Sequence, residues 1–178
     1  NPESQMVAVT VRAGSKAEMA LPDGTFVHLN AATNLEYDVN NSKQRLVKLS
    51  GEAFFDVAKN PDCPFKVIIN DLQIEVVGTS FNVKTYKKDI VETSLLSGRI
   101  RISGGSLPHE YTLSPGQKAT YSAMDRTLRI SKADAHVEAG WRDNYLIFES
   151  TPLIDVIAQI ERWYGVEIRL HHKQIAQD

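Results

Sequence analysis

The chain has little cysteine and no excess of basic residues. Cys63 is its single cysteine, so no internal disulfide can form. Twenty Lys and Arg against 22 Asp and Glu leave a formal net charge of −2, so we do not expect nucleic acid as a partner. No apolar run approaches the roughly 18–20 residues of a membrane-spanning helix, and no signal peptide is visible. With 42% hydrophobic residues over 178 positions, the sequence still predicts a globular fold with a sizeable core.

Signals for catalysis and for a metal site are also scarce. The five histidines show no metal-ligand spacing, and the adjacent His171 and His172 would point to opposite faces of a strand. There is no G-x-S-x-G elbow, and neither a lysine nor a helix follows Gly104-Gly105, as a phosphate loop would require. Glu52 and Asp56 share one strand face, and we interpret them as solvated carboxylates on an outer face. We therefore expect no catalytic residue, no cofactor and no metal.

Short runs of alternating apolar residues, separated by glycine and proline corners, fill the first three quarters of the chain. Leu21-Pro22-Asp23-Gly24 is one corner, and a hairpin is predicted for 65–69 and 73–77 across Asn70-Asp71. This spacing is typical of a sandwich, a barrel or a solenoid. Similar corners recur at 49–51, 96–98 and 113–116, and we interpret them as an irregular β-solenoid or roll, with a closed barrel as the alternative. Residues 1–133 are assigned to this all-β domain.

The pattern changes in residues 134–178. A strand is predicted at 145–148, followed by Thr151 as an N-cap and a helix over 152–164 that ends at Gly165. Alternating apolar residues predict a second strand at 166–170, which completes a small β-α-β unit. Because the sequence ends soon after this strand, we expect a truncated C-terminal domain. Trp141 and Trp163 flank the unit, and we expect them to pack between the two parts.

Five segments, in order, resemble the motifs of FecR-like anti-sigma regulators. The segments are 21–31 (LPDGTFVHLNA), 49–57 (LSGEAFFDV), 77–83 (VGTSFNV), 96–100 (LSGRI) and 113–117 (LSPGQ). Trp141, the run 146–148 and Pro152-Leu153 are similar to the start of the C-terminal domain found in members from Bacteroides-like bacteria. Each motif is a glycine or proline corner that leads into a strand, so the motifs describe a scaffold and not a reaction centre.

The resemblance implies a location and two protein partners. Such proteins resemble single-pass inner-membrane regulators, and this sequence would be the periplasmic part, without the membrane anchor. A cytoplasmic segment absent from this sequence would hold an extracytoplasmic-function (ECF) sigma factor. The periplasmic part would receive a signal from the N-terminal signalling domain of a TonB-dependent outer-membrane transporter. Residues 134–178 would be the start of a domain similar to the secretin/TonB short N-terminal domain.

We hypothesise that partner contact occurs at the β-α-β unit, through the edge of the second strand and the exposed face of the helix. The candidate partner-binding residues are Val166, Ile168 and Leu170 on the strand and Asp155, Gln159 and Arg162 on the helix. Two alternatives remain open: a glycan- or ligand-binding β-solenoid module, and a hydrolase of the β-helical type.

Overall fold

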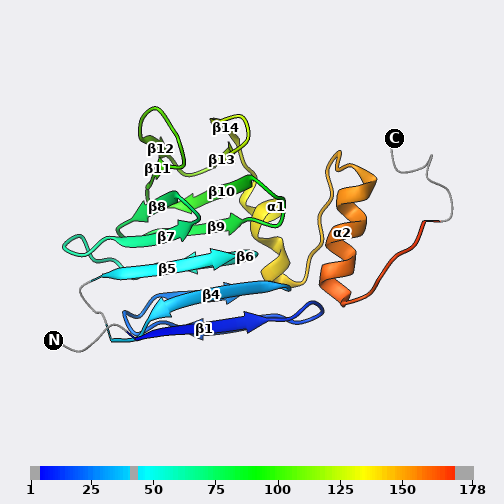
Figure 1. The fold of residues 1–178 in the computed structure, drawn as a ribbon, viewed down its shortest axis with the longest axis horizontal. Helices are drawn as coiled ribbons and strands as arrows, with labels where there is room; N and C mark the ends of the chain where they lie inside the picture. Colours follow the sequence, from blue (N-terminus) through cyan, green and yellow to red (C-terminus); the bar gives the residue numbers. More distant parts are fainter. Residues whose placement is uncertain (1–4, 41–43, 171–178) are drawn as a thin grey trace.

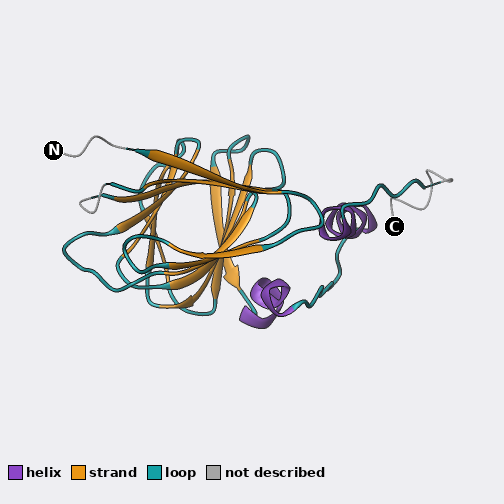
Figure 2. Cartoon of the chain, turned by 90° about the horizontal axis from the view of Figure 1, so that it is seen from below, coloured by secondary structure: helices purple, strands orange, loops and turns teal. Residues whose placement is uncertain are grey.

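The protein forms two facing β-sheets with helices only near its C-terminus (Figures 1 and 2). The structure is a computed structural model and describes residues 5–40 and 44–170. Sheet 1 contains, in spatial order, β1 (Met6–Val11), β4 (Thr33–Asp38), β5 (Arg45–Ser50), β7 (Phe65–Ile69), β8 (Leu72–Val76), β11 (Ile100–Gly104) and β12 (Tyr111–Leu113). Sheet 2 contains β14 (Thr127–Lys132), β13 (Gln117–Ser122), β10 (Ile90–Ser97), β9 (Ser80–Lys84), β6 (Glu52–Asp56), β3 (Phe26–Leu29) and β2 (Ala17–Ala20).

The main core lies between the two sheets and follows from the alternation seen in the sequence. On β7, Phe65, Val67 and Ile69 are buried while the intervening residues are half-buried, as expected when one face of a strand meets a core. Phe55 and Phe81 are fully buried and stack with ring centroids 5.2 Å apart. The apolar side chains of this layer need no hydrogen-bond partners, as is typical of the core of a β-sandwich.

The mainly β class is confirmed, but the chain forms a two-sheet sandwich in place of the expected irregular solenoid. Among the described strands, every pairing is antiparallel except that of β5 with β7, whereas stacked solenoid coils would pair in parallel. The hairpin predicted across Asn70 is confirmed as β7–β8, and Asn70 adopts a left-handed φ of 53°.

The recurring glycine corners have a different role from the one we expected. Each lies where the chain passes from one sheet to the other: Gly51 between β5 and β6, Gly98 between β10 and β11, and Gly116 between β12 and β13. Gly98 has a φ of +90°, and a Cβ there would lie 2.6 Å from the side-chain oxygen of Thr79. The corner therefore needs glycine for both its conformation and its close approach. The corners recur in the sequence because the chain crosses repeatedly between the two sheets, and repeated crossings do not require the stacked coils of a solenoid.

Helices follow the last strand. They are α1 (Ala135–Ala139), a 3₁₀ turn, η1 (Gly140–Asp143), and α2 (Leu153–Tyr164). The predicted helix over 152–164 and its end at Gly165, with φ 65°, are confirmed. The N-cap is Pro152 and not Thr151, with φ −54° and ψ 139°. The sequence did not predict α1 or η1.

The predicted β-α-β unit is present only as its helix. Neither residues 145–148 nor residues 166–170 are strands, although both lie in the described part of the chain. An alternating pattern becomes a strand only when a neighbouring strand supplies hydrogen-bond partners, and neither segment pairs with a described strand. None of the helices in the described ranges is both long enough and apolar enough to span a bilayer.

Candidate functional site

The outer face of sheet 2 is the place where the C-terminal helices meet the sandwich. On β6, Phe55 points into the core while Phe54 points outward, and yet Phe54 is only 3% exposed. Ala139 and Trp141 cover it, and Leu96 and Trp163 pack against the same cluster. The prediction that the two tryptophans pack between the two parts of the chain is therefore confirmed.

Four polar side chains form a hydrogen-bonded group beside this cluster, which we call the polar node: Asn30, Glu52, Asn82 and Trp141. The Trp141 indole N–H donates to the Asn82 side-chain oxygen at 3.0 Å. The Asn82 amide donates to Glu52 Oε1 at 2.9 Å, and the Asn30 amide donates to Glu52 Oε2 at 2.8 Å. Asn30, Glu52 and Asn82 each come from a different sequence motif, so the fold gathers three motifs that looked like separate corners.

The polar node fixes the orientation of each of its members. The Asn82 oxygen accepts from Trp141, and the Asn30 oxygen accepts from the Ala31 N–H at 2.8 Å. Each amide therefore turns its NH₂ group toward Glu52, which must accept at both carboxylate oxygens. An ionised carboxylate has only acceptors and matches this arrangement, whereas a protonated one would place a donor against a donor.

Burial acts against the ionised form of Glu52. Desolvation raises the pKa of Glu52, and the charge of Lys84 together with the two amide hydrogen bonds partly opposes this rise. The expectation that Glu52 is a solvated carboxylate is wrong, because Glu52 is 6% exposed and both of its carboxylate oxygens accept from buried amides. Asp56, at the other end, is exposed and accepts from the Ser80 hydroxyl at 2.7 Å, as expected of a solvated carboxylate.

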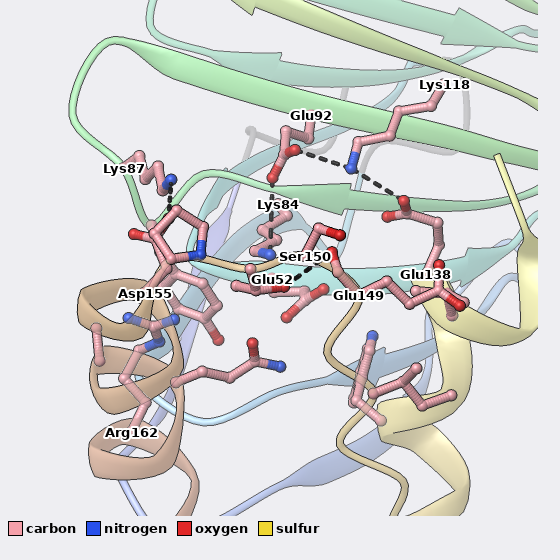
Figure 3. A pocket seen from close by; sticks show the side chains of 18 of the residues that line it. Glu52, Lys84, Lys87, Glu92, Lys118, Glu138, Glu149, Ser150, Asp155 and Arg162 are labelled. Carbon is pink, nitrogen blue, oxygen red and sulfur yellow. Dashed lines mark hydrogen bonds and ion pairs between the residues drawn. The ribbon is translucent and has the colours of Figure 1, made fainter. Parts of the chain in front are cut away.

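A cleft of about 480 Å³ separates α2 from sheet 2 and is lined mainly by polar and charged residues (Figure 3). Lys118 on β13 lies 2.8 Å from Glu92 on β10 and 2.9 Å from Glu138 on α1, so this ion-pair group ties α1 to the sheet. Burial alone would raise the pKa of Glu92, but the hydrogen bond and charge of Lys118, with help from Lys84, hold it below its usual value. The same pairing raises the pKa of Lys118 against the effect of its own burial.

The six candidate partner-binding residues fall on two different surfaces. Asp155, Gln159 and Arg162 line the cleft and face the sandwich. Asp155 accepts a 2.7 Å hydrogen bond from Lys87, and the Arg162 guanidinium lies 4.0 Å from the Tyr86 ring centre.

The other three candidates lie beyond the end of α2. Val166 and Leu170 are 51% and 41% exposed, and the Ile168 backbone N–H donates to the Glu161 carboxylate at 2.7 Å. The three candidates on the helix therefore face the sandwich, whereas Val166 and Leu170 are exposed to solvent.

The turn between β1 and β2 also reaches α2, which the sequence did not indicate. The Gly14 N–H donates to the Arg162 carbonyl at 2.8 Å, in the last turn of α2. Lys16 Nζ donates to the Trp141 carbonyl at 2.7 Å and lies 3.5 Å from the Trp163 ring centre. Gly14 and Gly165, both with positive φ, allow the two backbones to approach closely. The only sequence signals were the isolated glycines at these two positions.

The site has the chemistry of a docking contact. Within residues 5–40 and 44–170, no three His, Cys, Asp or Glu side chains are grouped so that they could hold a metal ion. His171 and His172 lie outside the described residues. Cys63 is a half-buried loop cysteine. Fold and site together define a β-sandwich that carries a docked helical extension, with hydrogen bonds and ion pairs across the contact.

Comparisons with known proteins identify the family. The sequence matches the family described as FecR protein over residues 7–101 and the family described as FecR, C-terminal, over residues 145–178. This chain belongs to the FecR family, which confirms the resemblance seen in the motifs.

Two solved structures are similar to it, both described as a "putative anti-sigma factor" from Parabacteroides distasonis ATCC 8503. One is 32% identical with a TM-score of 0.84, over 92% of this chain and 76% of that one. The other is 31% identical with a TM-score of 0.83, over 90% of this chain and 76% of that one. No curated protein sequence matches the chain.

Proposed function

We propose that this chain is the periplasmic part of a membrane-anchored anti-sigma regulator that acts by protein–protein contact. In this proposal it relays a signal from the N-terminal signalling domain of a TonB-dependent outer-membrane transporter to an ECF sigma factor. Membership of the FecR family and the similarity to two anti-sigma factor structures support the regulatory role. A cytoplasmic segment of the whole protein would hold the sigma factor, and we assign no sigma contact to any residue of this chain.

The observation that carries the proposed partner contact is the exposed apolar surface that follows α2. Val166 and Leu170 are 51% and 41% exposed, and their segment pairs with no described strand. Exposed apolar side chains on a segment outside both sheets suit a partner that adds a strand of its own. We therefore propose Val166, Ile168 and Leu170 as the primary contact. Asp155, Gln159 and Arg162, proposed as partner contacts too, line the cleft between α2 and sheet 2.

Binding of the full periplasmic region to the signalling domain of the transporter encoded beside it tests this proposal. Val166→Asp places a charge on the proposed surface, and we expect its Kd to rise at least about tenfold, since a buried apolar contact is worth about 1.4 kcal/mol or more. Met124→Asp is the matched control, because Met124 is 80% exposed in the turn between β13 and β14, and its Kd should not change.

Isothermal titration calorimetry would give both Kd values, and circular dichroism would show that both variants are folded. An unchanged Kd for folded Val166→Asp, or an equal loss in both variants, would remove this surface from the proposal.

A further inference from the structure

Helix α2 turns its polar side toward the sandwich, which is unusual for a helix that lies against a domain. Asp155, Gln159 and Arg162 fall on one side of the helix by its 3.6-residue period, and all three line the charged cleft. Of the large apolar residues on α2, Ile154 and Tyr164 are 55% and 65% exposed, whereas Ile157 is buried. Among the described residues of α2, only Trp163 packs against a hydrophobic cluster of the sandwich, so an apolar stripe is not what joins most of the helix to the sheets.

The contacts that do hold α2 lie at its ends, and most of them involve charge. Near the start of the helix, Lys87 and Asp155 form an ion pair whose side chains are 57% and 29% exposed. Near its end, Arg162 stacks on Tyr86 and Lys16 stacks on Trp163. Two uncharged contacts lie at the same end: the Gly14 N–H donates to the Arg162 carbonyl, and Trp163 packs against the Phe54 cluster. Lys87, Asp155 and Arg162 line the cleft, and Figure 3 labels all three.

The preceding turn is held quite differently. Trp141 in η1 is 5% exposed, contacts Phe54 and donates to the buried Asn82. The ion pairs of Lys118 with Glu92 and Glu138 join α1 to the sheet, and these three side chains are about four-fifths buried, so salt screens them less. Residues 144–152, which form neither helix nor strand, separate this anchored turn from α2. Figure 2 shows α1 against the outer side of a sheet and α2 farther out, beyond the strand ends.

We propose that α2 is a detachable arm. It leaves the sandwich when its charged contacts with Lys87 and Tyr86 are screened or displaced, and residues 144–152 act as its tether. The α1–η1 turn stays anchored through Trp141 and the polar node. This inference goes beyond the proposed function, because it concerns a movement of the chain by itself and requires no particular partner.

Hydrogen exchange of the full chain, followed by mass spectrometry, measures this movement. A released helix of this length is only marginally stable in water, so its amides lose protection when it detaches. The Debye length falls from about 10 Å at about 0.1 M salt to about 3 Å at about 1 M, which weakens exposed ion pairs. Between these salt concentrations we expect exchange in Leu153–Tyr164 to accelerate about threefold or more, while peptides covering η1 and β6 stay unchanged.

A pair of matched lysine variants separates the arm contact from general charge effects. Lys87 and Lys48 are 57% and 58% exposed, and each pairs with one carboxylate, but only Lys87 contacts α2. At low salt, Lys87→Ala should accelerate exchange in α2 about threefold or more, and Lys48→Ala should not change it. The charge reversal Lys87→Asp with Asp155→Lys should restore protection.

Three results would overturn the proposal: α2 and η1 lose protection together, salt leaves α2 unchanged, or the two lysine variants behave alike. None of these measurements involves a transporter domain, so their failure is distinguishable from failure of the proposed partner contact.

Discussion

The interior of the sandwich and the contact on the outer face of sheet 2 both bury large aromatic side chains, but they differ in what surrounds them. Between the sheets, Phe55 and Phe81 stack on each other within the main hydrophobic core. On the outer face, Phe54 and Trp141 lie beside Glu52 and Asn82, which are 6% and 2% exposed. The stability of the interior therefore depends on how completely the side chains fill its volume. The stability of the outer contact depends on pairing each hydrogen-bond donor with an acceptor.

This difference has an energetic consequence. Loss of a large side chain from a close-packed interior leaves a cavity and costs about 3–5 kcal/mol. Loss of one partner from a buried hydrogen bond costs about 1–3 kcal/mol, because the remaining group is left unsatisfied. An exposed ion pair contributes about 0–1 kcal/mol. The interior, the polar node and the arm contact of α2 should respond to substitution in that order.

The largest expected effect is in the interior. Phe81→Ala should lower the free energy of unfolding by about 3–5 kcal/mol, since Phe81 is fully buried and stacks on Phe55. Urea denaturation measures it, with Phe26→Ala as the control. Phe26 is 40% exposed on β3, and its loss should cost about 1 kcal/mol or less. Similar losses in both variants would show that the apolar interior is not what stabilises the sandwich.

An intermediate effect is expected at the polar node. Trp141→Phe keeps an aromatic ring against Phe54 but removes the N–H that donates to Asn82, so we expect a loss of about 1–3 kcal/mol. Trp163→Phe provides the comparison, because the described contacts of Trp163 are apolar packing and the stacked Lys16. Urea unfolding followed by far-UV circular dichroism would separate the two variants. An equal effect would mean that the hydrogen bond to Asn82 contributes nothing beyond ring packing.

The smallest effect concerns pH. Because burial raises the pKa of Glu52, the folded protein holds this proton more tightly than the unfolded chain does. Its contribution to stability is therefore fully present below the ordinary pKa of 4.5 and is lost as pH rises through the raised value. Glu52→Gln removes this dependence, so the variant should gain stability relative to the wild type between pH 4.5 and neutrality. The substitution itself should change the free energy of unfolding by on the order of 1 kcal/mol.

Glu92→Gln supplies the opposite sign for the same experiment. The pairing of Glu92 with Lys118 lowers its pKa, so this carboxylate stabilises the protein above its unfolded pKa, and the stability is lost as pH falls. Urea denaturation from about pH 4 to pH 8 would give the slope of the free energy of unfolding against pH for both variants. If Glu52→Gln and Glu92→Gln showed the same slope, the contrast between the two carboxylates would be wrong.

Much of the local structure could be predicted from the sequence. The hairpin at Asn70, the helix that ends at Gly165 and the burial of Trp141 each follow from neighbouring residues and their period. The strand at 166–170 was wrong, because alternation describes a side-chain pattern and a strand also needs a neighbour with which to pair.

The candidate site was predicted less well than the fold. Glu52 occupies an outward-facing position on β6, and the sequence pattern did not indicate that it is only 6% exposed. The amides that bind Glu52 lie 22 and 30 residues away in sequence, and no spacing rule connects them. Nothing in the three family motifs indicated that their polar residues Asn30, Glu52 and Asn82 form one hydrogen-bonded group.

The sequence by itself determined the β-rich class, the glycine corners and the family, because these depend on residue type, period and order along the chain. Only the tertiary structure decided that the corners cross between two sheets, that Asn30, Glu52, Asn82 and Trp141 join, and that α2 turns its charged side inward. The physical reason is that a hydrogen bond or an ion pair between distant segments forms only after the backbone has brought them within about 3 Å, and local patterns contain no information about that approach.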